Sequence, residues 1–315
     1  MSNAEERTRA LKAEALRLGF QKVGIAKAGS ADPEGRMRAW LDRGHGGEMS
    51  YLSRTLAERE DTTVLLPGAR SVVALMISYF RPESEALAAR SLGKVARYAV
   101  GRDYHVLVRR KVRTLRRSLL RLDPEAEVHP TIDTSPVMER AWAERAGIAW
   151  IGKSTMAIAP ELGTYTFLAT LVTTSELVPD EAAVDRCGSC TRCLDACPTQ
   201  AFVAPYQLDA TKCITYWNVE QTGAFTEKTP ALHGWLAGCD ICQEVCPWNK
   251  FKQASPELRF GPRPELEGLD LARLADPSEH AYHDELVDKT ALKRTGGAAL
   301  SRNARALLLE ETKLD

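Results

Sequence analysis

Residues 187–198, "CGSCTRCLDACP", place four cysteines and a closing proline within twelve positions. A second block at residues 239–248, "CDICQEVCPW", nearly repeats this pattern with three cysteines. The first block has the Cys-x2-Cys-x2-Cys-x3-Cys-Pro spacing of bacterial ferredoxins, in which three thiolates bind one [4Fe-4S] cluster and the fourth binds the other cluster. The sequence therefore predicts a small ferredoxin-like domain that holds two [4Fe-4S] clusters.

The eight cysteines of the chain divide into two sets of four. The second block lacks one ligand, and Cys213 in "LDATKCITYW" is the nearest cysteine that can supply it. Crossed ligation then assigns every cysteine. The first set is Cys187, Cys190, Cys193 and Cys246, and the second set is Cys197, Cys213, Cys239 and Cys242. Zinc is the alternative, but zinc sites usually use paired Cys-x2-Cys units rather than triplets that end in Cys-Pro.

Length and charge limit the class of protein. A chain of 315 residues with 44% hydrophobic residues is long enough for about two domains. Lys plus Arg equals Asp plus Glu, 42 each, so a nucleic acid can be held only by a local basic patch. The N-terminus lacks an apolar signal segment, and no run of about 18 apolar residues follows. We expect a cytoplasmic monomer with no membrane partner, in which cysteines bind metal rather than form disulfides.

Helices and strands alternate over the first part of the chain. Apolar spacing predicts helices at 4–18 and 103–122, and apolar runs predict strands at 22–26, 71–80 and 165–174, of which 71–80 is central in a sheet. This mixture predicts an α+β protein whose N-terminal part is a layered α/β domain. The common nucleotide motifs G-x-G-x-x-G and the Walker loop are absent, as is the D-x-H-x-x-G signature.

A further helix is expected from Ser135, as N-cap, to Gly147, with Pro136 at the first helical position. The helix at 103–122 has a strongly basic face, which is either solvated or a contact for a polyanion. The C-terminal stretch reads as a linker and a short helical tail. We therefore expect three parts: residues 1–178 as the catalytic α/β domain, 179–255 as the cluster domain, and 256–315 as the tail.

Several motifs resemble the epoxyqueuosine reductases, the cobalamin-dependent iron-sulfur enzymes of the last step of queuosine synthesis in tRNA. The resemblance runs from about Gly19 to Lys250 and rests on "HGGEMSYL" (45–52), "LPGARSVV" (66–73), "YAVGRDYH" (98–105), "DTSPVMERAWAERAGIAWIGKST" (133–155) and the cysteine blocks. It implies that the N-terminal domain holds cobalamin, to which the clusters pass electrons from an external low-potential donor. It also implies a tRNA substrate whose anticodon loop carries epoxyqueuosine.

The resemblance implies that Asp133 is the catalytic residue. Reducing an epoxide to an alkene expels the oxygen as water, so an acid must protonate the leaving oxygen. An aspartic acid serves this role only if burial raises its pKa toward the working pH. The alternative is that Asp133 caps a turn ahead of a helix. Tyr104 and His105 either reach the cofactor face or pack at the start of their helix.

Further contacts to the corrin are expected from the same family regions, and a strand residue such as Leu168 is alternatively a simple core residue. The expected contacts are Tyr98, Asp133, Lys153, Ser154, Thr155 and Leu168. Aromatic and basic residues near the clusters either contact tRNA or shield the clusters: Tyr216, Trp217, Trp248, Lys250 and Lys252. Two other functions stay open, a non-catalytic iron-sulfur electron carrier and a reductive dehalogenase-like corrinoid enzyme.

Overall fold

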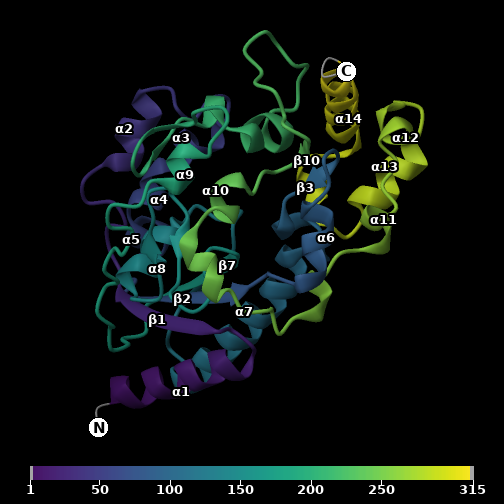
Figure 1. Ribbon diagram of the computed structural model, residues 1–315. Coiled ribbons are helices and arrows are strands. Elements are labelled where there is room, and N and C mark those ends of the chain that lie inside the picture. The colour runs from purple at the N-terminus through teal and green to yellow at the C-terminus, as the bar shows by residue number, and fades with distance from the viewer. Residues whose placement is uncertain (1–2, 313–315) are drawn as a thin grey trace.

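An antiparallel sheet of four strands lies at the base of the protein (Figure 1). The computed structural model describes residues 3–312. The strands follow the order β1 (Lys22–Lys27), β2 (Ser71–Ser78), β7 (Thr166–Thr173) and β4 (Val128–Thr131). Every residue of β2 is buried, as predicted for a central strand. Because all pairings in this sheet are antiparallel, the fold is α+β.

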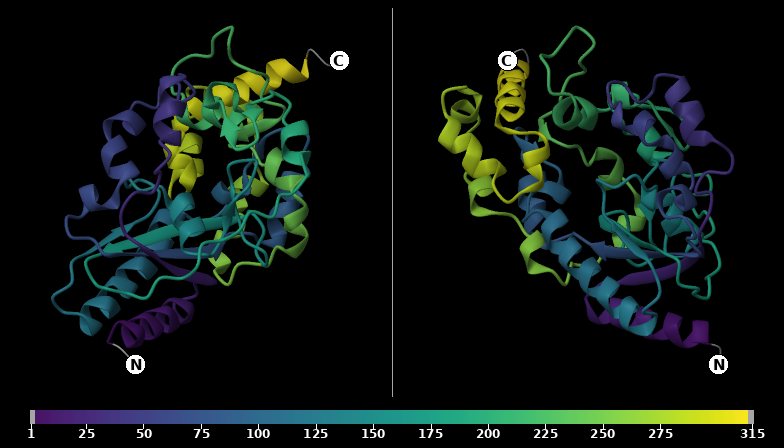
Figure 2. Two further views of the ribbon diagram at one scale, coloured as in Figure 1. Left: turned by 90° about the vertical axis from the view of Figure 1, so that its left-hand side faces the viewer. Right: turned by 180° about the vertical axis from the view of Figure 1, so that it is seen from behind.

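Helices cover both faces of the sheet. The helices α1 (Asn3–Arg17) and α7 (Tyr104–Leu122) lie on one face, and α8 (Glu139–Arg145) lies on the other (Figures 1 and 2). Side chains alternate along a strand, so β2 supplies both cores. Val73, Leu75 and Ile77 join the core under α1 and α7, whereas Val72, Ala74 and Met76 join the core under α8.

The predicted helices at 4–18 and 103–122 are confirmed by α1 and α7. Asp103 caps α7 by accepting a hydrogen bond from the backbone amide of His105. The helix expected from Ser135 begins only at Glu139, so this boundary was wrong by one turn. The reason is local: the amides of Thr134 and Val137 bond to carbonyls two residues back and form tight turns in place of a first helical turn.

The C-terminal stretch packs onto the rest of the protein. Strand β10 (Trp235–Ala237) pairs in parallel with β3 (Lys94–Val95), and α14 (Gly297–Glu311) lies against β10. The side chain of Asn303 on α14 is fully buried and donates to the carbonyls of Asn218 and Leu236. The tail therefore shares one continuous core with α1 and α7.

The other elements are short and connect these layers. They are α2 (Arg36–Asp42), α3 (Tyr51–Arg54), α4 (Leu56–Glu60), α5 (Thr62–Leu65), η1 (Pro82–Ser84), α6 (Glu85–Ala88), η2 (Arg97–Ala99), β5 (Trp150–Ile151), β6 (Ala157–Ile158), α9 (Arg192–Asp195), β8 (Phe202–Ala204), β9 (Gln207–Leu208), η3 (Ala210–Lys212), η4 (Tyr216–Glu220), α10 (Ile241–Glu244), η5 (Pro247–Phe251), η6 (Leu258–Phe260), α11 (Pro264–Glu267), α12 (Leu271–Ala275), α13 (His280–Val287) and η7 (Ala291–Arg294). Among the described helices, none has the length and apolar character needed to cross a bilayer.

Candidate active site and cluster-binding loops

Asp133 lies just beyond the end of β4, at a cavity of about 210 Å³. Its backbone has a φ of 49°, a left-handed conformation that is rare outside glycine. Such strain costs about 1–3 kcal/mol and persists only where the surroundings hold the residue in place. The side chain is 57% exposed, so the carboxylate is open to a ligand as well as to its protein partners.

The first turn of α7 holds the Asp133 carboxylate. The Tyr104 hydroxyl donates to Asp133 Oδ2 at 2.8 Å, and His105 Nε2 lies 2.9 Å from the same oxygen. The other ring nitrogen of His105, Nδ1, lies 2.8 Å from Asp103 Oδ1. The rings of Tyr104 and His105 stack with centroids 4.1 Å apart. Tyr104 and His105 therefore belong to the site as well as to the helix start.

The carboxylates of Asp103 and Asp133 determine which group of the Asp103–His105–Asp133 network carries the proton. Burial disfavours the charged form of His105, but the hydrogen bonds to Asp103 and Asp133 outweigh burial and raise its pKa to about 9. Burial likewise favours neutral Asp133, but the bonds from His105 and Tyr104 outweigh it and lower the pKa of Asp133. The condition set above for Asp133 to act alone as the acid, a pKa raised by burial, is therefore not met. At neutral pH the proton resides on His105.

The cavity beside Asp133 is lined by both apolar and polar residues. Its lining comprises Tyr104, Asp133, Glu139, Arg140, Met156, Ala157, Thr164, Thr166, Phe167 and Leu168. The buried atoms Thr166 Oγ1 and Glu139 Oε1 make no hydrogen bond to any residue that the structure describes. Burial raises the pKa of Glu139 to about 8, with a further contribution from the charge of Asp133. Unpaired buried polar atoms facing a cavity fit a ligand that carries its own amide groups.

Of the residues expected to contact a corrin, Asp133 and Leu168 line this cavity together. The other four, Tyr98, Lys153, Ser154 and Thr155, are not among its lining residues. Lys153 Nζ donates to the carbonyls of Gly188 and Cys190, at 2.6 and 3.0 Å, and so points to the first cysteine loop. Thr155 has a φ of 62°, and its carbonyl accepts from Arg140 at 2.5 Å.

Ser154 is buried, and Tyr98 is partly buried with its pKa raised by desolvation. The Tyr98 ring approaches the backbone at Gly238, directly before Cys239. The segment 152–155 thus contacts both Arg140, which lines the cavity, and the first cysteine loop. Tyr98 lies near the second cysteine block, at residues 239–248.

The thiols gather as two groups. Burial and the neighbouring thiols Cys193, Cys187 and Cys190 raise the pKa of Cys246. Burial and the charges of Cys213 and Cys197 raise the pKa of Cys239. The pKa of Cys242 is raised by burial, by Cys239 and Cys213, and to a smaller extent by Cys193 of the other group. The two groups therefore adjoin one another.

The donor set of both groups consists of thiols alone. All eight cysteines are free and partly buried, so none is taken by a disulfide. Eight thiols in two groups of four match the donor set of two [4Fe-4S] clusters.

Arg97 connects the first half of the chain to the second cysteine block. Its guanidinium contacts Asp240 at 3.2 Å, Glu244 at 2.8 Å and Glu85 at 2.7 Å. Asp240 is fully buried and also accepts from the backbone amide of Arg97. This ion pair lies beside Cys239 and holds the cluster loop against η2.

The aromatic residues proposed as tRNA contacts are mostly covered. Tyr216 and Trp217 are 6% and 7% exposed, which favours the shielding alternative over a contact with tRNA. Both pack in a small core that includes Cys213. Trp248 packs edge-on against Trp150 at 4.8 Å, and Lys252 lies 4.7 Å above the Phe80 ring. These contacts agree with shielding of the cysteine loops.

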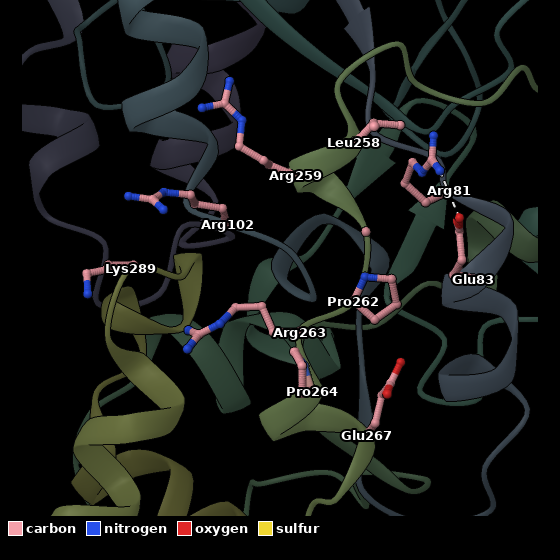
Figure 3. A pocket seen from close by; sticks show the side chains of 11 residues that line it. Arg81, Glu83, Arg102, Leu258, Arg259, Pro262, Arg263, Pro264, Glu267 and Lys289 are labelled. Carbon is pink, nitrogen blue, oxygen red and sulfur yellow. Dashed lines mark hydrogen bonds and ion pairs between the residues drawn. The ribbon is translucent and has the colours of Figure 1, made fainter.

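A larger cavity, of about 580 Å³, lies between η6, α11 and the loop before α7. Five cationic side chains line it: Arg81, Arg102, Arg259, Arg263 and Lys289. Figure 3 shows Arg102, Arg259 and Lys289 gathered on one side and Arg81 paired with Glu83 on the other. This is a local basic patch on a chain whose total charge is zero.

Comparisons with known proteins agree with this geometry. Residues 186–249 match the "4Fe-4S double cluster binding domain" family, and residues 59–134 match the family "Epoxyqueuosine reductase QueG, DUF1730". The epoxyqueuosine reductase of Cellulophaga algicola is 35% identical over 305 residues, covering 96% of this chain and 98% of that protein.

Two solved structures are similar over most of their length. One is an epoxyqueuosine reductase with an epoxyqueuosine-modified tRNA-Tyr stem loop, with 30% identity, a TM-score of 0.83, and coverage of 96% of this chain and 81% of that chain. The other is the Bacillus subtilis enzyme, described with the loop of its catalytic aspartate swung out of the active site, with 30% identity, a TM-score of 0.85, and the same coverages. The fold and the double-cluster loops define an iron-sulfur oxidoreductase. The chain belongs to the epoxyqueuosine reductase family.

Proposed function

We propose that this protein reduces epoxyqueuosine to queuosine at the wobble position of tRNA. The observation that carries the proposal is the Asp133 network at the cavity, in a chain that also gathers two groups of four thiols. The Bacillus subtilis relative is described with an aspartate-bearing catalytic loop, and we infer from the D-T-x-P motif that Asp133 is the corresponding residue of this chain.

The first thiol group, with Cys246, would hold one [4Fe-4S] cluster, and the group with Cys213 would hold the other. Residues 179–255 would then be the cluster domain, and residues 1–178 would hold cobalamin, with Asp133 and Leu168 among the residues that contact it. A cavity of about 210 Å³ would hold only part of so large a ligand, since pockets for much smaller molecules usually measure about 300–1,000 Å³. When bound, cobalamin supplies electrons to the epoxide, and these come from an external low-potential donor through the clusters.

The role of this chain's own residues is to hold and move a proton. The imidazolium of His105 stores a proton 2.9 Å from Asp133 Oδ2, and Tyr104 fixes the orientation of the same carboxylate. Asp133 faces the cavity and passes the proton to the leaving oxygen as His105 replaces it. The two residues thus act as one acid, although the pKa of Asp133 alone is lowered.

The partner we propose is a tRNA whose anticodon loop carries epoxyqueuosine, because a relative was solved with such a stem loop. Loop nucleotides are already partly unstacked and are therefore easily extruded into a cavity. The basic patch in Figure 3 offers contacts to phosphates away from that nucleotide. We propose that the protein acts as a monomer.

Anaerobic reconstitution tests this function. The purified chain is loaded with iron and sulfide, its visible spectrum is recorded with and without cobalamin, and tRNA carrying epoxyqueuosine is then added with a low-potential reductant. We expect queuosine in the digested tRNA by mass spectrometry. Clusters without cobalamin binding and without queuosine would instead identify an electron carrier.

A further inference from the structure

Glu139 places a second carboxyl group at the cavity that contains Asp133. It is the first residue of α8 and belongs to the lining of the cavity. Its Oε1 atom is fully buried and makes no hydrogen bond to any group within residues 3–312. Buried polar atoms without a partner are rare in folded proteins and are retained mainly where they serve a function.

The groups around Glu139 favour its neutral form. Burial is the largest influence and raises its pKa to about 8, and the negative charge of Asp133 acts in the same direction. Arg140 and the backbone amides of Glu139 and Asp133 lower the pKa of Glu139, but their effect is smaller than that of burial and Asp133 together. The positive charge of His105 is balanced by Asp133 and Asp103, which its two ring nitrogens contact. Glu139 is therefore mostly a carboxylic acid at neutral pH, whereas Asp133 is ionised.

The stoichiometry of the proposed reaction requires two acids. Converting an epoxide to an alkene breaks both C–O bonds, forms the C=C bond and releases the oxygen as water. This consumes two electrons, which the external low-potential donor supplies through the clusters, and two protons. The His105–Asp133 pair holds one proton, and its reloading requires another proton from solvent. Two carboxyl groups whose pKa values are pushed apart at one site are the usual sign of divided acid–base roles.

We propose that Glu139 is the second acid of this site and supplies one of the two protons that convert the epoxide oxygen to water, while the His105–Asp133 pair supplies the other. The inference rests on the proposed function. The carboxyl proton of Glu139 moves to the oxygen as its C–O bond breaks, and solvent reprotonates Glu139 after product release.

A structural role is the competing explanation. The backbone amide of Asp133 acts on the Glu139 carboxyl, whose pKa it lowers, and so couples Glu139 to the strained backbone at Asp133. Glutamine in this position keeps the size and an acceptor oxygen but has no acidic proton. Glu139→Gln therefore removes the acid and keeps this polar interaction, and Glu139→Asp keeps the acid on a shorter side chain.

The first test reads protonation directly and needs no turnover. Infrared spectra of the full chain with both clusters are compared between wild type and Glu139→Gln over a pH series. We expect a carboxylic acid C=O band at neutral pH that the variant lacks and that disappears as the pH rises through about 8. Identical acid bands in the two proteins would show that Glu139 is ionised and would overturn the proposal.

The second test measures single turnover on tRNA carrying epoxyqueuosine. We expect Glu139→Gln to slow the reaction about 100-fold or more, as removal of a general acid does, with unchanged cobalamin spectrum and tRNA binding. Glu139→Asp recovers part of the rate. Glu144→Gln is the matched control, because Glu144 lies on the same helix and also accepts a backbone bond, from Ile151.

These outcomes separate the two proposals. Full turnover by Glu139→Gln overturns the role of Glu139, whatever the infrared spectrum shows. A slow Glu139→Gln variant that has also lost cobalamin or tRNA binding supports the structural role and overturns the acid role. A wild-type protein that binds cobalamin and shows the Glu139 band but forms no queuosine refutes the proposed function instead.

Discussion

Replacing Asp103 by asparagine should lower the pKa of His105 without disturbing the helix. Asp103 is one of two carboxylates that raise this pKa from the usual 6.5 to about 9, and its Oδ1 lies 2.8 Å from His105 Nδ1. If the two carboxylates contribute equally, removing one lowers the pKa by about one pH unit, which corresponds to about 1.4 kcal/mol. Asparagine is as good an N-cap as aspartate, so the cap of α7 is retained.

The sign of the effect on stability follows from the direction of the shift. A histidine whose folded pKa is raised contributes stability that is complete below its unfolded pKa of about 6.5. That contribution is lost as the pH rises through about 9. Asp103→Asn should therefore be less stable than wild type by about 1.4 kcal/mol near pH 6, and the difference should disappear above pH ~10.

The assay is an NMR titration of the histidine rings in the anaerobic full chain. The chain has six histidines, and His105→Gln assigns the signal of His105. Asp209→Asn is the matched control, because Asp209 also caps a helical turn, by accepting from Thr211, but contacts no histidine in the described structure. An unchanged His105 titration in Asp103→Asn would refute the assignment of the proton to His105.

Three further variants test the rest of the site. Asp133→Asn should reduce turnover by about 100-fold or more while iron and cobalamin stay bound; full turnover would exclude Asp133 as the acid. Arg97→Met leaves Asp240 as a buried charge without its partner and should cost about 3–5 kcal/mol in unfolding free energy, whereas Arg17→Met, at an exposed pair, should leave the unfolding free energy nearly unchanged. Cys246→Ser should lose iron from the first cluster and keep the second, measured by iron analysis and electron paramagnetic resonance; full iron content would contradict the ligand assignment.

The candidate site was partly predictable from the sequence. The cysteines stand in a motif whose spacing carries the chemistry, and Asp133 could be named only through the family resemblance. Glu139 lies in the motif of that resemblance but has no signal of its own, because its raised pKa arises from burial at the cavity and from the charge of Asp133. The direction of the Asp133 pKa likewise could not be obtained from the sequence, since it depends on the contacts with His105 and Tyr104.

Local pattern predicted the main elements and the double-cluster chemistry. Apolar periodicity predicted α1, α7 and the buried strand β2, because it depends on neighbours within a few residues. Cysteine spacing predicted a double-cluster domain, in agreement with the family match at residues 186–249. Only the tertiary structure decided which side chains share the cavity and which of them keep a proton. Burial and hydrogen bonds between residues far apart in the chain set those pKa values, and no window of sequence contains both partners.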